Sequence, residues 1–123
     1  MKKKVLTKAV KKVIVLGGSS GIGKAIAERF AKEGWLVLVG SHDLVNAQKV
    51  VDGLKGKGHV AIKVDVRNDS EIEKFQKKAK KLFGGFQALV NSVGISDGQH
   101  SLDSDFNKWD NAIQVMLYGS VKI

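Results

Sequence analysis

A run of glycines and serines directly after an apolar stretch constrains this chain more than any other feature. Residues 13–16 are Val-Ile-Val-Leu, and residues 17–23 read Gly-Gly-Ser-Ser-Gly-Ile-Gly. From Ile22, apolar residues recur at helical spacing as far as Gly34. A strand, a glycine turn and a helix start, in that order, are typical of a site for the pyrophosphate of a dinucleotide. The turn lets phosphate oxygens approach the backbone, and the first turn of the helix offers unpaired N–H groups.

The composition is that of an ordinary globular chain. Hydrophobic residues make up 43% of the 123 residues, enough for one domain with a modest core. The sequence has no cysteine, which excludes disulfides, thiolate metal sites and cysteine nucleophiles. No apolar run approaches the roughly 18 residues of a transmembrane helix, and the basic N-terminus is not followed by the apolar segment that a signal peptide would have. We therefore expect a cytoplasmic protein with no membrane partner and no metal site.

Positive charge is concentrated at the N-terminus. Residues 1–12 carry six lysines and no acidic residue, within a chain of net charge +9. We interpret them as a basic N-terminal extension to a domain over residues 13–123, with the role of a solubilising tail. Nucleic-acid binding is the alternative, and the lack of aromatic residues among the lysines argues against it.

Apolar runs and helical patterns alternate along the rest of the chain. The patterns predict strands at 13–16, 35–39, 59–64 and 86–90, and helices at 22–33, 44–54, 71–83 and 106–120. Buried strands separated by helices predict a parallel sheet covered on both faces. The expected fold class is α/β, a Rossmann-like doubly wound sheet of order 3-2-1-4, with ligand at the carboxyl ends of the first and fourth strands.

Three helix ends carry recognisable signals. Gly34 is expected to end the first helix, and Asp43 to cap the start of the second. Ser70, with Glu73 three residues later, predicts a capping box for the third helix.

Four segments of the chain resemble the short-chain dehydrogenases/reductases. The family's TGxxxGxG turn matches residues 16–23, with Leu16 in place of the threonine. The acidic residue that follows the family's third strand matches the Asp-Val of residues 65–66. The family's Asn-Asn-Ala-Gly is kept at the first and last of residues 91–94, and the tryptophan-containing start of the next helix resembles residues 107–110. The turn sequence looks most like that of 3-oxoacyl-[acyl-carrier-protein] reductases.

The resemblance implies that the chain binds NAD or NADP. It assigns to the cofactor Gly17, Ser19, Ser20, Gly21, Ile22, Gly23, Asp65, Val66, Asn91 and Gly94. The glycines would permit the tight turn and the close approach of phosphate, while the serines would offer hydroxyls to ribose or phosphate. Asp65 and Val66 would hold the adenine, and Asn91 would line the nicotinamide side. A simple turn residue at Asp65 and a structural tie between strands at Asn91 remain the alternatives.

The end of the second strand favours NADP over NAD. An enzyme for NAD usually carries an acid there that bonds the ribose 2′-OH. Here the strand ends in Gly40, Ser41 and His42, and the first acid is Asp43. We expect a 2′-phosphate to be accepted, with Ser41 or His42 as its donor; a solvent-exposed loop residue is the alternative for His42.

The family's catalytic residues are not expected within this chain. The family uses a serine, a tyrosine and a lysine four residues after that tyrosine to move a proton to or from the substrate oxygen. Tyr118 and Lys122 have the spacing, but they follow Gly94 too closely, on the helix before the one that carries the family's pair. We interpret them as a chance match. Met116 stands where the family has an asparagine that holds a relay water.

These features predict an NAD(P)-dependent oxidoreductase that transfers hydride between nicotinamide and a carbonyl or alcohol substrate. This chain would be its cofactor-binding half, truncated before the C-terminal strands and helices, and inactive by itself. The resemblance implies a homo-oligomer with a small-molecule substrate. The alternative is a non-catalytic dinucleotide-binding regulator or partner subunit, which Met116 and the altered motif at 91–94 favour.

Overall fold

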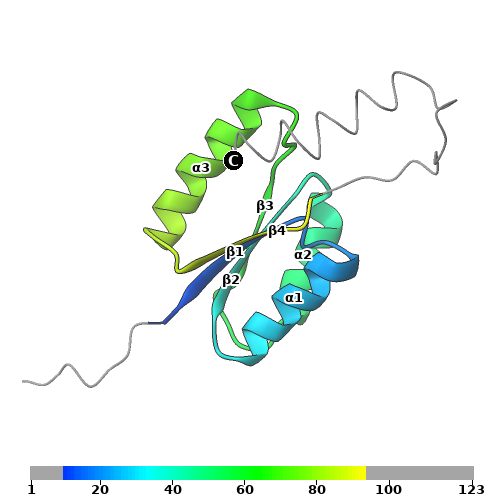
Figure 1. Ribbon diagram of the computed structural model, residues 1–123, viewed down its shortest axis with the longest axis vertical. Coiled ribbons are helices and arrows are strands. Elements are labelled where there is room, and N and C mark those ends of the chain that lie inside the picture. The colour runs from blue at the N-terminus through cyan, green and yellow to red at the C-terminus, as the bar shows by residue number, and fades with distance from the viewer. Residues whose placement is uncertain (1–9, 94–123) are drawn as a thin grey trace, which may run out of the picture.

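The computed structural model describes residues 10–93, which form a parallel sheet between two layers of helices (Figure 1). In this part of the chain the strands are β1 (Lys12–Leu16), β2 (Leu36–Ser41), β3 (Val60–Lys63) and β4 (Ala88–Asn91). The helices are α1 (Gly21–Lys32), α2 (Leu44–Gly53) and α3 (Asp69–Phe83). The strand order is β3-β2-β1-β4, so the expected fold class and order are confirmed. The helix predicted over 106–120 lies outside the described residues.

The two faces of the sheet explain why the strands lack polar alternation. In β1, Val13 and Val15 pack toward α1 and α2, whereas Ile14 and Leu16 pack toward α3. Successive side chains of a strand point to opposite faces, so a strand that is covered on both sides is apolar throughout. All four of these residues are at most 3% exposed. The continuous apolar runs of the sequence are therefore central strands of a doubly covered sheet.

The helix ends follow the sequence signals in two of the three predicted cases. Gly34, directly after the C-cap of α1, has φ +88°, the left-handed conformation that glycine adopts readily. The Asp43 side chain accepts a hydrogen bond from the backbone N–H of Asn46 at 3.1 Å and caps α2. Both predictions are confirmed.

The capping box predicted at Ser70 and Glu73 is wrong, because α3 begins earlier. Asn68 is the N-cap, and its side chain accepts from the backbone N–H of Glu71 at 3.2 Å. The preceding loop favours this start: the Asp65 carbonyl accepts from the Asn68 N–H at 3.0 Å, and the Glu71 carboxylate accepts from the Asp65 N–H at 3.1 Å. Ser70 therefore lies inside the first turn.

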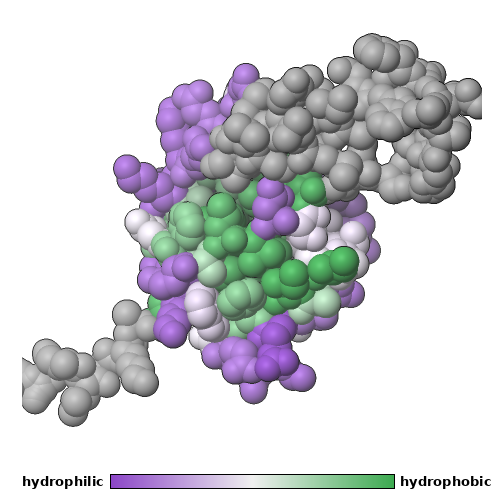
Figure 2. Space-filling model, in the orientation of Figure 1, coloured by the Kyte–Doolittle hydropathy of each residue, from purple (hydrophilic) through white to green (hydrophobic). Residues whose placement is uncertain are grey.

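An apolar strip is exposed where α3 meets β4, and hydrophobic surface is visible on this side in Figure 2. Leu82, Phe86 and Leu89 are 53%, 49% and 47% exposed, and Phe86 and Leu89 line a groove of about 310 Å³. Within the described sheet β4 is an edge strand. An apolar edge of this kind favours contact with further polypeptide. No helix in residues 10–93 has the length and apolar character needed to cross a bilayer.

The position of the α3 cap can be tested with two neighbouring substitutions. Asn68→Ala should lower the free energy of unfolding by about 0.5–2 kcal/mol, because it removes the acceptor for an N–H of the first helical turn. Ser70→Ala is the matched control and should change stability by only a few tenths of a kcal/mol. Urea denaturation of both variants measures the difference. A larger loss of stability for Ser70→Ala than for Asn68→Ala would contradict the cap at Asn68 and support the capping box predicted at Ser70 and Glu73.

Candidate functional site

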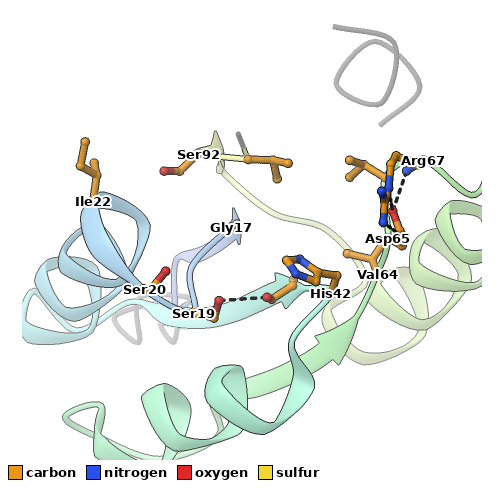
Figure 3. Close-up of a pocket in the computed structure, with 13 residues that line it drawn as sticks. Gly17, Ser19, Ser20, Ile22, His42, Val64, Asp65, Arg67 and Ser92 are labelled. Atoms are coloured by element: carbon orange, nitrogen blue, oxygen red, sulfur yellow. Dashed lines mark hydrogen bonds and ion pairs between the residues drawn. The ribbon is translucent and has the colours of Figure 1, made fainter. Parts of the chain in front are cut away.

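A pocket of about 490 Å³ opens at the carboxyl ends of the strands (Figure 3). Its walls come from the turn after β1, the end of β2, and the segments that follow β3 and β4. The lining residues are Gly17, Ser19, Ser20, Ile22, Gly40, Ser41, His42, Val64, Asp65, Val66, Arg67, Ser92 and Val93. Parallel strands end at one edge of a sheet, which is why segments far apart in sequence meet here.

Two glycines, Gly17 in the turn and Gly23 at the start of α1, are required by close backbone contacts. Gly17 has φ +79°, and a Cβ there would lie 2.8 Å from the backbone carbonyl of Ser92. Its N–H donates to the carbonyl of Gly40 at 2.8 Å. A Cβ on Gly23 would lie 2.1 Å from the Gly17 carbonyl oxygen. No larger residue fits either position without moving backbone, so these glycines bring the turn, β2, β4 and α1 together.

The start of α1 is open to an acceptor from outside the helix. Ser20 is its N-cap residue but makes no side-chain cap hydrogen bond, and the first turn has no acidic residue. In contrast, Asp43 caps α2 and Asn68 caps α3. The first N–H groups of a helix have no partner within it, and the helix dipole adds partial positive charge at the same end. Because Ser20 and Ile22 line the pocket, this end of α1 favours a negatively charged ligand.

Two hydroxyl groups and one carboxylate are organised at the end of β2. Ser41 is 5% exposed; its hydroxyl donates to Ser19 Oγ at 3.0 Å and accepts from the Asp43 N–H at 3.0 Å. Besides capping α2, the Asp43 carboxylate accepts from Asn46 Nδ2 at 2.6 Å. Asp43, the first acid after β2, is thus directed toward its own helix and is not among the pocket lining.

On the opposite wall, Arg67 holds the carboxylate of Asp65. Arg67 donates from its backbone N–H and Nε to Oδ1, at 2.9 and 3.1 Å, and from Nη2 to Oδ2 at 2.9 Å. Hydrogen bonds from the Arg67 side chain lower the pKa of Asp65 below its ordinary value of 3.8, against an opposing effect of burial, and the nearby His42 lowers it further. The same contact raises the pKa of Arg67. A carboxylate that accepts these bonds still has lone pairs for a ligand.

Most of the predicted cofactor residues lie around this one pocket. Gly17, Ser19, Ser20, Ile22, Ser41, His42, Asp65 and Val66 line it. Gly21 and Gly23 are not in the lining; both lie in the first turn of α1, and Gly23 packs closely against Gly17. Asn91 is exposed, and its side-chain oxygen accepts from the Val93 N–H at 3.0 Å. Gly94, Met116, Tyr118 and Lys122 lie outside the described residues.

Sequence reasoning did not predict five of the lining residues, Gly40, Val64, Arg67, Ser92 and Val93. A signal existed for each, because all stand at or just after the carboxyl end of a predicted strand. For Arg67, the additional signal is a cation two residues after a carboxylate that was already a candidate.

Comparison with known proteins places this chain in a family. The family model described as short chain dehydrogenase matches residues 11–123. The chain belongs to the short-chain dehydrogenase family. It is 35% identical over 114 residues to the 3-oxoacyl-[acyl-carrier-protein] reductase FabG of Staphylococcus epidermidis, which covers 89% of this chain and 46% of the reductase.

Two solved structures of similar fold agree with this assignment. A short chain dehydrogenase from Bacillus anthracis has a TM-score of 0.84 and 30% identity, over 91% of this chain and 47% of that one. An actinorhodin polyketide ketoreductase variant with NADPH has a TM-score of 0.81 and 25% identity, over 92% and 44%. The chain therefore spans a little under half the length of these three proteins.

The contact between Gly23 and Gly17 predicts that a methyl group added at Gly23 lowers the stability of the protein strongly. Gly23→Ala should lower the free energy of unfolding by about 1–3 kcal/mol or more, because the methyl group meets a backbone oxygen that cannot move aside cheaply. Gly53→Ala is the control, since it ends α2 with no atom within 4 Å of its added Cβ. That change should be neutral or stabilise by up to about 1 kcal/mol. Thermal and urea unfolding compare the two, and equal stabilities would contradict the packing described.

The pairing of Asp65 with Arg67 predicts that a substitution of Arg67 changes the pKa of Asp65. Arg67→Gln should raise the pKa of Asp65 toward 3.8, because the charged donors are removed. Since the folded pKa is lowered, the stabilising effect of the pair is present above pH 3.8 and is lost as the pH falls through the lowered value. Carboxyl chemical shifts in an NMR titration report the pKa. Arg29→Gln, which removes the exposed pair with Glu33, should leave it unchanged; an equal pKa in all three proteins would contradict the prediction.

Proposed function

We propose that the protein is an NAD(P)-dependent oxidoreductase that transfers hydride between nicotinamide and a carbonyl or alcohol substrate. In this proposal the pocket at the strand ends holds the cofactor. The observation that carries it is the open start of α1 beside a turn of bare backbone, in a chain whose family and named relatives are dehydrogenases and reductases. That combination of N–H donors and close approach suits a diphosphate.

In this proposal, residues in and near the pocket are assigned to each part of a dinucleotide. The N–H groups at the start of α1 would hold the diphosphate, and Ser19 and Ser20 would offer hydroxyls to it or to a ribose. At the other end, Val66 would cover the adenine ring while Asp65 accepts from its exocyclic amine. Asn91 and Gly94 would lie on the nicotinamide side. When bound, nicotinamide supplies the hydride acceptor or donor, and the residues named here bind and orient it.

Four observations favour NADP over NAD. The nearest acid after β2, Asp43, is directed to the α2 cap instead of the pocket. Asp65, the carboxylate in the pocket lining, is neutralised by Arg67. His42 lines the pocket as a possible donor, and one solved relative carries NADPH. A 2′-phosphate would therefore meet little repulsion at the end of β2.

Proton transfer to the substrate oxygen is proposed to depend on residues beyond this chain. The chain covers less than half of the FabG reductase that it resembles, and Tyr118 with Lys122 is proposed to be a chance match to the family's catalytic pair. Residues 1–123 by themselves should then bind cofactor without turning over substrate. We further propose that the whole enzyme is a cytoplasmic homo-oligomer.

Cofactor binding can be tested at the first residue of α1. Gly21→Asp should weaken NADP binding about 100-fold or more, since like charges about 4 Å apart repel by roughly 4 kcal/mol near a protein surface. Gly21→Asn is the matched control: it has nearly the same shape and tolerates the φ of +57° at this position, but it adds no charge. Isothermal titration calorimetry with NADP and NAD measures both variants.

The outcomes separate the parts of the proposal. The unaltered protein should bind NADP more tightly than NAD, and Gly21→Asn should bind NADP far better than Gly21→Asp. Absence of binding to both nicotinamide cofactors by the unaltered protein would overturn the proposed function. Tighter binding of NAD would overturn only the preference for NADP.

A further inference from the structure

We propose that Ser41 is a positioning residue of the cofactor site, which acts by orienting the hydroxyl of Ser19 and makes no donor contact of its own with the ligand. This inference rests on the proposed function, because it assigns a role within the proposed cofactor pocket. It starts from the fact that Ser41 is the only buried polar residue in the described part of the chain, at 5% exposure.

The backbone around Ser41 is fixed from both sides. The carbonyl of Gly40 accepts from the Gly17 N–H of the glycine turn at 2.8 Å, and the carbonyl of Ser41 accepts from the Val64 N–H after β3 at 2.8 Å. Ser41 also pairs in register with Lys63 of the neighbouring strand. These backbone hydrogen bonds therefore hold the Ser41 side chain in a fixed position at the carboxyl ends of the strands.

The hydrogen bonds of the Ser41 hydroxyl leave no proton for a further hydrogen bond. A serine hydroxyl has one proton to donate, and Ser41 donates it to Ser19 Oγ at 3.0 Å (Figure 3). Its oxygen accepts from the Asp43 N–H at 3.0 Å. Phosphate oxygens at neutral pH act chiefly as acceptors, so a 2′-phosphate would have to compete with Ser19 for the same proton. The expected direct contact from Ser41 to that phosphate thus does not fit the hydrogen bonds present.

The hydrogen bond from Ser41 orients the hydroxyl of Ser19. Because Ser19 Oγ accepts the bond from Ser41, its own proton is turned away from Ser41, and Ser19 lines the pocket beside the start of α1. The buried serine therefore holds a donor in place for an oxygen of the diphosphate or of the adjoining ribose. An already oriented donor avoids part of the entropy cost of ordering it when the ligand binds.

A double-mutant cycle in the intact protein tests this role. Ser41→Ala should weaken binding of NADP and of ADP about three- to tenfold in calorimetric titrations, as expected for loss of one organised hydrogen bond. Ser19→Ala should weaken binding by at least as much. In the Ser19→Ala background, Ser41→Ala should have no further effect on affinity, because the group that it orients is already absent.

Control variants separate positioning from general stability. Asp43→Ala should destabilise the protein by removing the α2 cap, yet leave NADP affinity unchanged, since it keeps the backbone N–H that Ser41 accepts from. Ser41→Thr keeps the hydroxyl and should restore most of the affinity lost in Ser41→Ala. Unfolding curves of every variant accompany the titrations.

The possible results distinguish failure of the Ser41 inference from failure of the proposed function. Equal losses from Ser41→Ala in both backgrounds, or a threonine variant as weak as the alanine variant, would overturn the inference while leaving the proposed function standing. So would an alanine variant with unchanged affinity. If the unaltered protein binds neither NADP nor ADP, the proposed function itself fails, and that result is read before any variant is compared.

Discussion

The close backbone packing around the glycine turn is the constraint on which the rest of the site depends. Gly17 is bound to Gly40 of β2, lies against the backbone of Ser92 after β4, and is contacted in turn by Gly23 of α1. These contacts join three of the four walls of the pocket without a single side chain. A methyl group at Gly17 or Gly23 would meet backbone atoms and force these segments apart.

Charge in the described chain is arranged so that this cavity can receive an anion. The other two helices use Asp43 and Asn68 to satisfy their first N–H groups, whereas α1 has no such partner of its own. Both carboxylates near the pocket already have partners: Asp43 accepts hydrogen bonds from its own helix, and Asp65, in the pocket wall, is paired with Arg67. The start of α1 has no acidic residue of its own, and Asp65 nearby is paired with Arg67. This end of the helix is electrostatically suited to phosphate, and its backbone N–H groups supply the attraction.

The sequence was sufficient to predict the sheet and the turn because both depend on repeated or local patterns. Apolar runs such as 13–16 appear wherever a strand is covered on both faces, and parallel connections leave few possible orders. The α3 cap was mispredicted because Asn68 and Ser70 are both good caps. Two hydrogen bonds decide between them: the Asn68 N–H donates to the Asp65 carbonyl, and the Asp65 N–H donates to the Glu71 carboxylate. The Ser41–Ser19 bond could not be predicted, since it joins side chains from two different strand ends.

That last bond changes how selectivity at the end of β2 should be understood. Of the two donors that the sequence offered to a 2′-phosphate, Ser41 already donates to Ser19, which leaves the exposed His42 as the candidate donor at that strand end. The guanidinium of Arg67 binds Asp65, so its charge is partly compensated where it stands. Preference for the phosphorylated cofactor would then come mainly from the lack of a competing carboxylate, with a modest contribution from His42. An arginine that grips the phosphate is not needed for such a preference, because removing a repulsive partner discriminates between ligands as effectively as adding an attractive one.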